Sequence, residues 1–526
     1  MMPIVITAAA DLDPGRICQI AAGQRFEIAP ALLEEVDRRC AAARAALRAG
    51  DAVYGVNTGM GALVGVRLTE SEQLAHQRNL LLARATGGPP WLAEPEVRAL
   101  FVVRLRTFLS GDSGVSANLC LRLAEFLDAG ILPAVPRTGI GSAGEIIPLA
   151  HAFGPLVGIG RVLEPAAAPP PAHPAPADPA PAHPAPAHPA PAHPAPADDT
   201  ALPARGTRPA AEVLRVRGLG EFSLGPREGH ALLAGVPGAT ALMVLRLAEA
   251  QVLEAWMESS TALSVAAAGA SRDPYAPGTA RGDEVVAGVL ARVRAAAGEL
   301  TEPHGLQAPV SFRVGGPVLA HVLRAAGALA GACDRALGGV TDSPAFIDGR
   351  FTGTAGFHGV DLAAHGDGLT AALAHAAEVS AARLHRLLDP RVTGLPAQLA
   401  ARPGPDAGLV AVHKRAAGEV HAMRRLAVAT PVGLIETSGG QEDVQSFAWE
   451  ASEVVRQALN HSRAVTACEL LAGYQACALS SRPAPPGCRP VLDRLDQVVA
   501  PITADRPFGE DIERIIGMLG AAAAPG

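Results

Sequence analysis

Cysteine pairs are missing from this sequence. The seven cysteines are scattered and odd in number, and no two of them form a Cys-x-x-Cys pair. This pattern argues against a disulfide framework and against a structural zinc site. It predicts a protein of the reducing cytoplasm.

An excess of basic residues is also lacking. Asp and Glu number 51 against 44 Lys and Arg, which gives a formal charge of -7 and makes nucleic acid or an anionic membrane surface an improbable partner. The N-terminal MMPIVITAAADLDPGR has no basic start followed by an apolar run, so we read no signal peptide. No uninterrupted apolar run reaches the ~18 residues expected of a membrane span. Small molecules or protein partners remain.

What is present is helical periodicity. Nearly half of the 526 residues (49%) are apolar, enough for a large core. Apolar residues recur at three- and four-residue spacing in segments 31–47, 96–109 and 116–127, and three long Ala-rich stretches follow at 238–260, 315–337 and 368–388. Long helices with few charges usually pack on several sides. We expect an all-α, elongated helical bundle whose functional residues lie on connecting loops.

A proline repeat divides the chain. Residues 165–209 repeat Pro, Ala and His, and their prolines forbid helix or sheet ladders. We expect a disordered, extended insertion between an N-terminal domain (1–164) and a region of central and C-terminal helices (210–526). Its histidines, at 173, 183, 188 and 193, raise a metal hypothesis, but an extended chain does not converge ligands, so an expanded linker is favoured and no metal is expected.

Two glycine-rich loops are candidates for chemistry. DAVYGVNTGMG (51–61) presents Tyr54 among three glycines, and TGIGSAGEIIPLAH (138–151) runs from a flexible turn into a helix whose free amides could face an anion. Each of these patterns also occurs in ordinary turns.

These loops and further segments resemble the aromatic amino acid ammonia-lyase family, which contains the histidine and phenylalanine ammonia-lyases. YGVNTGMG is similar to its tyrosine loop, and GSAGEIIPLAH to the segment with its Ala-Ser-Gly triad. Further segments resemble other motifs of the family and occur in the family's order. They are HQRNLLLARATG, LSGDSGVS, GPREGHALLAG, QAPVSFRVGGPV, VTDSPAF, GFHG, RLLDPRVTGLPAQL and GQEDVQSF. The resemblance covers nearly the whole chain outside the proline repeat.

The resemblance implies a cytoplasmic, homotetrameric helical enzyme whose pockets are shared between subunits. The family removes ammonia from histidine or an aromatic amino acid. It uses a methylidene-imidazolone cofactor made from Ala-Ser-Gly, in which the middle serine loses its hydroxyl. General base catalysis alone does not suffice, because the abstracted proton is weakly acidic and ammonia leaves poorly.

The triad in this sequence is Ser142-Ala143-Gly144. Alanine has no leaving group on its β-carbon, so the electrophile cannot form by dehydration, and we expect no methylidene-imidazolone and no other cofactor. A register shift to Gly141-Ser142-Ala143 would move the reactive carbon by about 3.8 Å, and it is disfavoured.

Other positions are compared in the same way. Tyr54 matches the family's catalytic tyrosine, and Glu442 matches its acidic residue near the substrate amine. Arg313 matches the arginine that pairs with the substrate carboxylate, and Phe357 matches the aromatic residue beside the substrate ring. Arg84 stands where the histidine-type enzymes have a substrate-facing histidine. Replacements that surround the cofactor are Ala234, Val310, Ser343 and Val444.

Structural roles compete with these assignments. Tyr54 could cap its loop, and Arg313 and Glu442 could pair with each other, because buried charges need partners. His151 and His358 are expected to brace loops or pack. Arg84 and Arg106 add positive charge near the predicted pocket, which an anionic substrate or a salt bridge to Glu145 would explain.

Two functions remain open. The first is a lyase-type enzyme that performs elimination, addition or cyclisation on a carboxylate-bearing, amino acid-like small molecule without the imidazolone. The second is a catalytically inactive homologue that serves as a binding or scaffolding subunit. Retained Tyr54 and Arg313 favour the enzyme.

Overall fold

The computed structural model describes residues 2–49, 52–164, 206–300, 302–433 and 435–521. Helices dominate these ranges, and the only sheets there are three two-stranded ones. The strands are β1 (Ile4–Ile6) with β2 (Phe26–Ile28) in parallel, and β3 (Arg161–Leu163) with β4 (Thr207–Pro209) and β5 (Ala345–Ile347) with β6 (Arg350–Thr352) in antiparallel pairs. The predicted all-α fold is confirmed.

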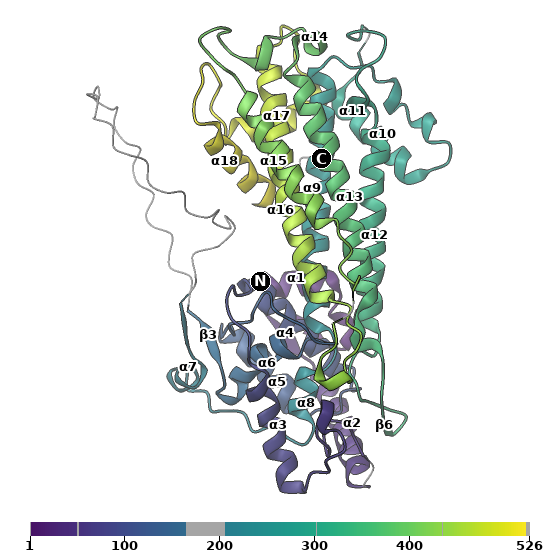
Figure 1. Cartoon of the computed structure of the whole chain (residues 1–526), viewed down its shortest axis with the longest axis vertical. Coiled ribbons are helices and arrows are strands. Elements are labelled where there is room, and N and C mark those ends of the chain that lie inside the picture. The colour runs from purple at the N-terminus through teal and green to yellow at the C-terminus, as the bar shows by residue number, and fades with distance from the viewer. Residues whose placement is uncertain (1, 50–51, 165–205, 301, 434, 522–526) are drawn as a thin grey trace, which may run out of the picture.

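The N-terminal part is built from short helices. They are α1 (Pro14–Ala21), α2 (Pro30–Arg48), α3 (Glu70–Arg84), α4 (Glu94–Leu109), α5 (Ala117–Asp128) and α6 (Ile146–Phe153). Local signals begin several of them: the Asp13 and Ser116 side chains accept backbone N–H groups of the first turn, and Thr69 with Glu72 forms a capping box. These helices form the lower end of the molecule in Figure 1.

The rest of the chain begins with two short helices at the lower end and then forms the long bundle and its upper end (Figure 1). The elements are α7 (Ala210–Val216), α8 (Glu228–Leu233), α9 (Pro237–Ala267), α10 (Glu284–Ala297), α11 (Val310–Arg313), α12 (Gly315–Gly338), α13 (Val360–Leu387), α14 (Pro390–Thr393), α15 (Val410–Leu426), α16 (Ala448–Leu479), α17 (Arg489–Asp496) and α18 (Phe508–Ala521). Helices α9, α12, α13 and α16 run along the long axis (Figure 1).

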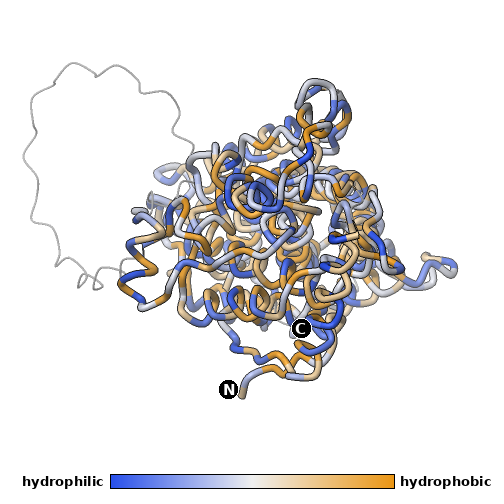
Figure 2. Tube along the Cα trace, turned by 90° about the horizontal axis from the view of Figure 1, so that it is seen from below, coloured by the Kyte–Doolittle hydropathy of each residue, from blue (hydrophilic) through white to orange (hydrophobic). Residues whose placement is uncertain are grey.

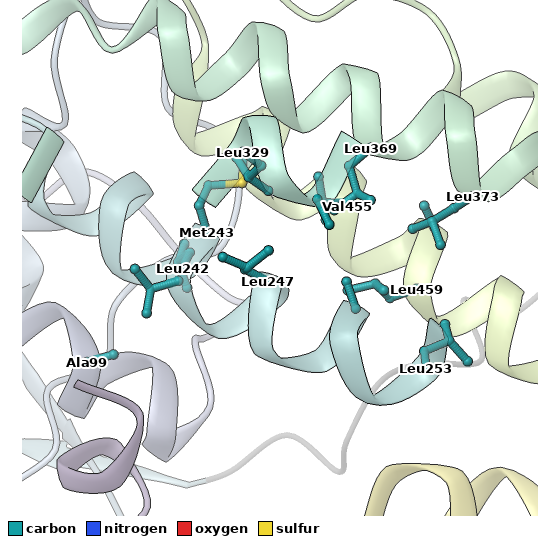
Figure 3. Packing of buried hydrophobic residues seen from close by; sticks show 14 of the residues in the cluster. Ala99, Leu242, Met243, Leu247, Leu253, Leu329, Leu369, Leu373, Val455 and Leu459 are labelled. Carbon is teal, nitrogen blue, oxygen red and sulfur yellow. The ribbon is translucent and has the colours of Figure 1, made fainter. Parts of the chain in front are cut away.

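The bundle core lies between these long helices. Figure 3 shows Leu247 of α9, Leu369 of α13 and Leu459 of α16 turned toward a common interior, and all three are buried. Apolar and hydrophilic residues alternate along the tubes seen from below in Figure 2, as expected of helices that bury one side and expose another. Burial of apolar surface is the main force that holds such helices together.

A buried charge network crosses the same core. Arg383 on α13 forms two hydrogen bonds with Glu469 on α16, of 2.6 and 2.9 Å, and both side chains are nearly inaccessible. Ser264 on α9 and Ser380 on α13 donate to the same carboxylate. Each charge is thereby paired, as burial requires.

The proline repeat falls mostly outside the described residues. Of the predicted insertion 165–209, residues 207–209 form β4 and pair with β3, so the regular structure resumes before the boundary that composition indicated. The metal hypothesis for the repeat histidines concerns residues outside the described ranges. Within those ranges there is no cluster of three or more His, Cys, Asp or Glu side chains fit to hold a metal.

Two helical stretches of the described residues are long and apolar enough to cross a membrane. They are Glu228–Ala267, which includes α9, and α12. The apolar window of the first is 89% buried inside the protein and that of the second 50%. A helix in the centre of a bundle meets the same criterion of length and composition.

Candidate active site

The tyrosine loop lies at the lower end of the bundle, before α3. The Tyr54 hydroxyl accepts a 2.8 Å hydrogen bond from the Gly61 amide, and the Asn57 side chain accepts one of 2.7 Å from Val53. Gly55 has a φ of +66°, and a β-carbon there would lie 2.4 Å from the His230 ring, so glycine is required for this close approach. The predicted loop-capping role of Tyr54 is therefore real, and the hydroxyl proton stays free to be donated.

His230 packs behind this loop. Its ring meets that of Tyr54 edge-on at a centroid distance of 6.2 Å. Burial lowers the pKa of His230 to about 3, helped by the charge of Arg227, so the imidazole is neutral at physiological pH. Sequence reasoning missed this residue, because a lone histidine on an apolar helix carries no distinguishing pattern.

The degenerate triad occupies the turn before α6. The Ser142 hydroxyl donates a 2.6 Å hydrogen bond to the Gly144 carbonyl, and the Ala143 amide donates one of 2.9 Å to Oε2 of Glu442. A ring closed in the shifted register would need the Ala143 nitrogen as its nucleophile, yet that nitrogen is held by Glu442. The Ser142 hydroxyl and the Ala143 nitrogen are thus both engaged in other hydrogen bonds.

Glu442 reaches the triad from a second loop. Its Oε2 also accepts a 3.1 Å hydrogen bond from the Thr437 hydroxyl, and the backbones of these two residues form an isolated bridge. The Gln445 amide donates to the Ile435 carbonyl and to Thr437, which fixes the loop further. The same loop touches the tyrosine loop, because the short helices Gly61–Leu63 and Ser438–Gly440 are in contact.

Arg84 ends α3 beside these groups. Its guanidinium makes only long contacts, 3.4 Å to the Leu80 carbonyl and 3.7 Å to Sδ of Met60 in the tyrosine loop. Burial lowers the pKa of Arg84, and the groups whose charge opposes this shift are Tyr54 and Glu442. Tyr54, Arg84, Glu442 and Ala143 therefore form one site within a single chain.

Glu145, next to the triad, accepts hydrogen bonds from the start of α9. Its two carboxylate oxygens accept the Gly238 and Ala239 amides at 2.7 and 2.6 Å. Burial nevertheless raises the pKa of Glu145 to about 8. The predicted salt bridge between Arg84 and Glu145 is wrong, because both oxygens are occupied by the helix and the opposite charge that acts on Glu145 is that of Arg104.

A narrow cavity lies under the triad. Its walls include Ala143, Glu145, His358, Trp449 and Glu450. Burial raises the pKa of Glu450 to about 7. Sequence reasoning did not find Glu450, although it follows the Gln441-Glu442-Asp443 motif closely, because a glutamate near the start of a helix usually faces solvent.

The remaining predicted groups divide between the two ends of the molecule. Phe357 is half-buried in a short turn before α13, and the carbonyl of its neighbour His358 accepts a hydrogen bond from Ser446 at the same cavity. Arg313, in contrast, precedes α12, whose 24 residues span about 36 Å before the chain returns to the triad end. The predicted structural pair of Arg313 with Glu442 is wrong, because Arg313 ends α11 at the upper end of Figure 1, whereas Glu442 contacts the turn before α6 at the lower end.

Two other assignments are settled by hydrogen bonds. His151 braces a loop, since its Nε2 accepts the Gly87 amide at 3.0 Å. Arg106 does not reach the site: it donates to the carbonyls of Leu337, Ala9 and Leu12 and so ties two helix ends together. Its positive charge needs no substrate to explain it.

Comparison with known proteins gives one consistent result. Residues 12–498 match the model of the family described as aromatic amino acid lyase. A histidine ammonia-lyase of Anaeromyxobacter sp. (strain K) is 31% identical over 94% of each chain, and a tyrosine ammonia-lyase of Cupriavidus metallidurans is 30% identical over 97% of this chain and 94% of that one.

Solved structures share the fold. Tyrosine aminomutase from Streptomyces globisporus superimposes with a TM-score of 0.86 at 24% identity, covering 99% of this chain and 97% of that one. The ergothioneine-degrading enzyme ergothionase of Treponema denticola gives a TM-score of 0.84 at 21% identity, covering 98% of each chain. Likeness at this level of identity concerns the fold alone.

Proposed function

The chain belongs to the aromatic amino acid lyase family, and we propose that it is a lyase-type enzyme that works without methylidene-imidazolone. Its substrate is a carboxylate-bearing, amino acid-like small molecule. The reaction is an elimination, an addition or a cyclisation that needs no strong electrophile. The observation that carries the proposal is that the charges of Tyr54 and Glu442 both act on Arg84, while Glu442 also accepts the Ala143 amide.

Each group has a defined task in this proposal. Tyr54 moves the proton: its hydroxyl is fixed by the Gly61 amide and has its own proton and a second lone pair to exchange with substrate. Glu442 faces the substrate nitrogen while it holds the Ala143 amide. Phe357 lies against the substrate side chain. Ala143 contributes only backbone, since its methyl group can neither leave nor form an electrophilic carbon.

In this proposal, a second copy of the chain supplies Arg313 to the pocket. A forked guanidinium suits a substrate carboxylate, but the arginine of the same chain is remote from Tyr54. Large apolar side chains are exposed near both ends: Leu63, Val66, Val432, Ile435 and Val444 around the site loops, and Val310 beside Arg313. Exposed apolar patches of this kind mark interaction surfaces. We propose a cytoplasmic homotetramer in which Arg313 of one subunit completes the pocket of another.

A second candidate function is an inactive binding or scaffolding subunit. The Ser142 hydroxyl satisfies its own turn, and the positions around the family's cofactor carry Ala234, Val310, Ser343 and Val444. These features favour a chain that does not form the family's cofactor and does not catalyse its reaction. The retained tyrosine and glutamate favour the enzyme, because a scaffold has no need to keep an ionisable pair at a pocket.

Turnover decides between the two functions. The purified protein is incubated with a panel of aromatic and other carboxylate-bearing amino acids, and products are followed by mass spectrometry beside a Tyr54→Phe variant. The enzyme proposal expects at least one substrate whose conversion depends on Tyr54. No conversion of any panel member, or conversion indifferent to Tyr54, supports the scaffold instead.

A further inference from the structure

Arg84 forms no ion pair with an acidic side chain of the described residues. Within the described ranges no carboxylate lies within ion-pair distance of it, and its Nε is buried without a hydrogen-bond partner. Its two remaining contacts, to a carbonyl at 3.4 Å and to a thioether sulfur at 3.7 Å, are long and weak. A guanidinium that loses water on folding needs compensation for its charge.

Other buried arginines of this chain show what compensation looks like. Arg104 pairs with Asp342 at 2.9 Å, and Arg383 pairs with Glu469. Arg98 and Arg272 instead donate to two or more backbone carbonyls at ordinary distances. Arg84 has neither kind of environment. Arg44 and Arg313 also have an Nε buried without a hydrogen-bond partner, but it is Arg84 on which the charges of Tyr54 and Glu442 act.

The acids near Arg84 are already engaged. Glu442 is the nearest carboxylate that acts on it, and its Oε2 accepts both the Ala143 amide and the Thr437 hydroxyl. Glu145 has both oxygens on the start of α9. The positive charge of Arg84 therefore has no carboxylate of its own among the described residues, and it lies near the tyrosine that is proposed to move the proton.

We infer that Arg84 binds an anionic group on the side chain of the substrate, so that the substrate class is an amino acid-like molecule with a second negative charge. Carboxylate, phosphonate and sulfonate share the required chemistry, because each accepts the two parallel N–H bonds of a guanidinium. This inference rests on the proposed function for its site. It differs from the role proposed for Arg313, which holds the carboxylate common to all amino acids.

Binding to charge-matched probes tests the inference without any need for turnover. Isothermal titration compares 4-carboxy-L-phenylalanine with 4-carbamoyl-L-phenylalanine, and L-glutamate with L-glutamine, pairs of nearly equal shape that differ in side-chain charge. We expect the charged member of at least one pair to bind roughly ten- to a hundred-fold more tightly, as charge-assisted hydrogen bonds allow. Arg84→Leu should reduce this ratio to about one, and Arg84→Lys should keep part of it.

Controls separate charge recognition from damage to the fold. Arg78→Leu removes an exposed arginine from the same helix and should leave the ratio unchanged. Thermal unfolding of each variant shows whether α3 is intact, and Arg84→Lys keeps the test valid if Arg84→Leu is unstable. Equal binding of charged and amide probes by the unmodified protein, binding of neither charged probe, or a ratio that survives Arg84→Leu would overturn the inference.

Failure of this inference about Arg84 can be distinguished from failure of the proposed enzymatic function. Tyr54→Phe should retain the charge preference in binding and lose turnover. If the charge preference is present but no substrate is converted by any form, Arg84 recognises an anion in a protein that is not a catalyst. If a neutral aromatic substrate is converted with dependence on Tyr54 while charge gives no advantage, the enzyme stands and the anionic class is wrong.

Discussion

The Ala143 amide and the Glu442 carboxylate are joined by a 2.9 Å hydrogen bond across 299 residues of sequence. This bond fixes the turn that corresponds to the family's cofactor triad to the loop that carries an acidic group of the site. It also occupies the backbone nitrogen on which a shifted ring closure would depend.

Loss of the Tyr54 hydroxyl should abolish proton transfer with little effect on folding. For Tyr54→Phe we expect turnover of any substrate found to fall by about 100-fold or more, as for removal of a general acid–base group. The free energy of unfolding should fall by only about 1 kcal/mol, because one hydrogen bond from Gly61 is lost. Steady-state kinetics and urea unfolding measure the two effects.

Tyr474→Phe is the matched control for that variant. Tyr474 donates a 2.8 Å hydrogen bond to Asp496 near the opposite end of the bundle. Its loss should cost similar stability and leave turnover unchanged. Equal loss of activity in both variants would show that Tyr54 acts only through the stability of the fold.

Complementation between chains should reveal a shared pocket. Tyr54→Phe and Arg313→Leu homo-oligomers are each expected to be nearly inactive. Co-expressed chains should recover a fraction of the activity, because some pockets then combine an intact Tyr54 with an intact Arg313 from another chain. Activity of the mixed oligomer no higher than that of the single variants would place both residues in unrelated roles, and light scattering gives the number of chains.

The buried pair of Arg383 and Glu469 should be sensitive to loss of one partner. Glu469→Gln leaves an arginine charge in the core of the bundle, for which we expect a loss of about 3 kcal/mol in the free energy of unfolding. Glu510→Gln, at the exposed pair with Arg514, should change stability by less than about 0.5 kcal/mol. Chemical denaturation of both variants is the measurement, and equal effects would contradict the account of the core.

Glu450 should make stability fall as pH rises. Its pKa is about 7 in the folded chain against the ordinary 4.5, because burial favours the protonated form, so the folded state binds more protons than the unfolded state between these values. Ionisation therefore destabilises the fold progressively between about pH 4.5 and 7. The penalty is about 3 kcal/mol above that window.

The matching variant is Glu450→Gln, which keeps an oxygen to accept the Ile140 amide but cannot ionise. Its free energy of unfolding should exceed that of the unmodified protein at pH 8 and approach it near pH 4.5. A difference between the two proteins that does not change with pH would show that Glu450 titrates as it does in water.

Periodicity was sufficient to predict the bundle. The Ala-rich segments 238–260, 315–337 and 368–388 lie within or one residue beyond α9, α12 and α13. The longest helix, α16 with 32 residues, carries Glu453, Arg456 and Glu469 among its apolar positions. These charges obscured its pattern, and they are tolerated because each finds a partner inside the fold.

The site was predictable only where motifs carry it. Tyr54, Glu442 and Ala143 were assigned from resemblance, whereas the hydrogen bond between Ala143 and Glu442 and the contact of their loop with the tyrosine loop came from the structure. Shared pockets were expected from the resemblance, but the linear pattern did not identify Arg313 as the residue that one chain holds far from Tyr54. Glu450 and His230 were missed because their behaviour comes from burial, which depends on helices far away in sequence.

The most direct test of the account is the intact mass of the purified protein together with its near-ultraviolet difference spectrum. With Ala143 in the middle of the triad, the mass should equal that of the unmodified chain and no imidazolone absorbance should appear. A mass lower by two waters, with that absorbance, would contradict the central claim that this protein works without its relatives' ring.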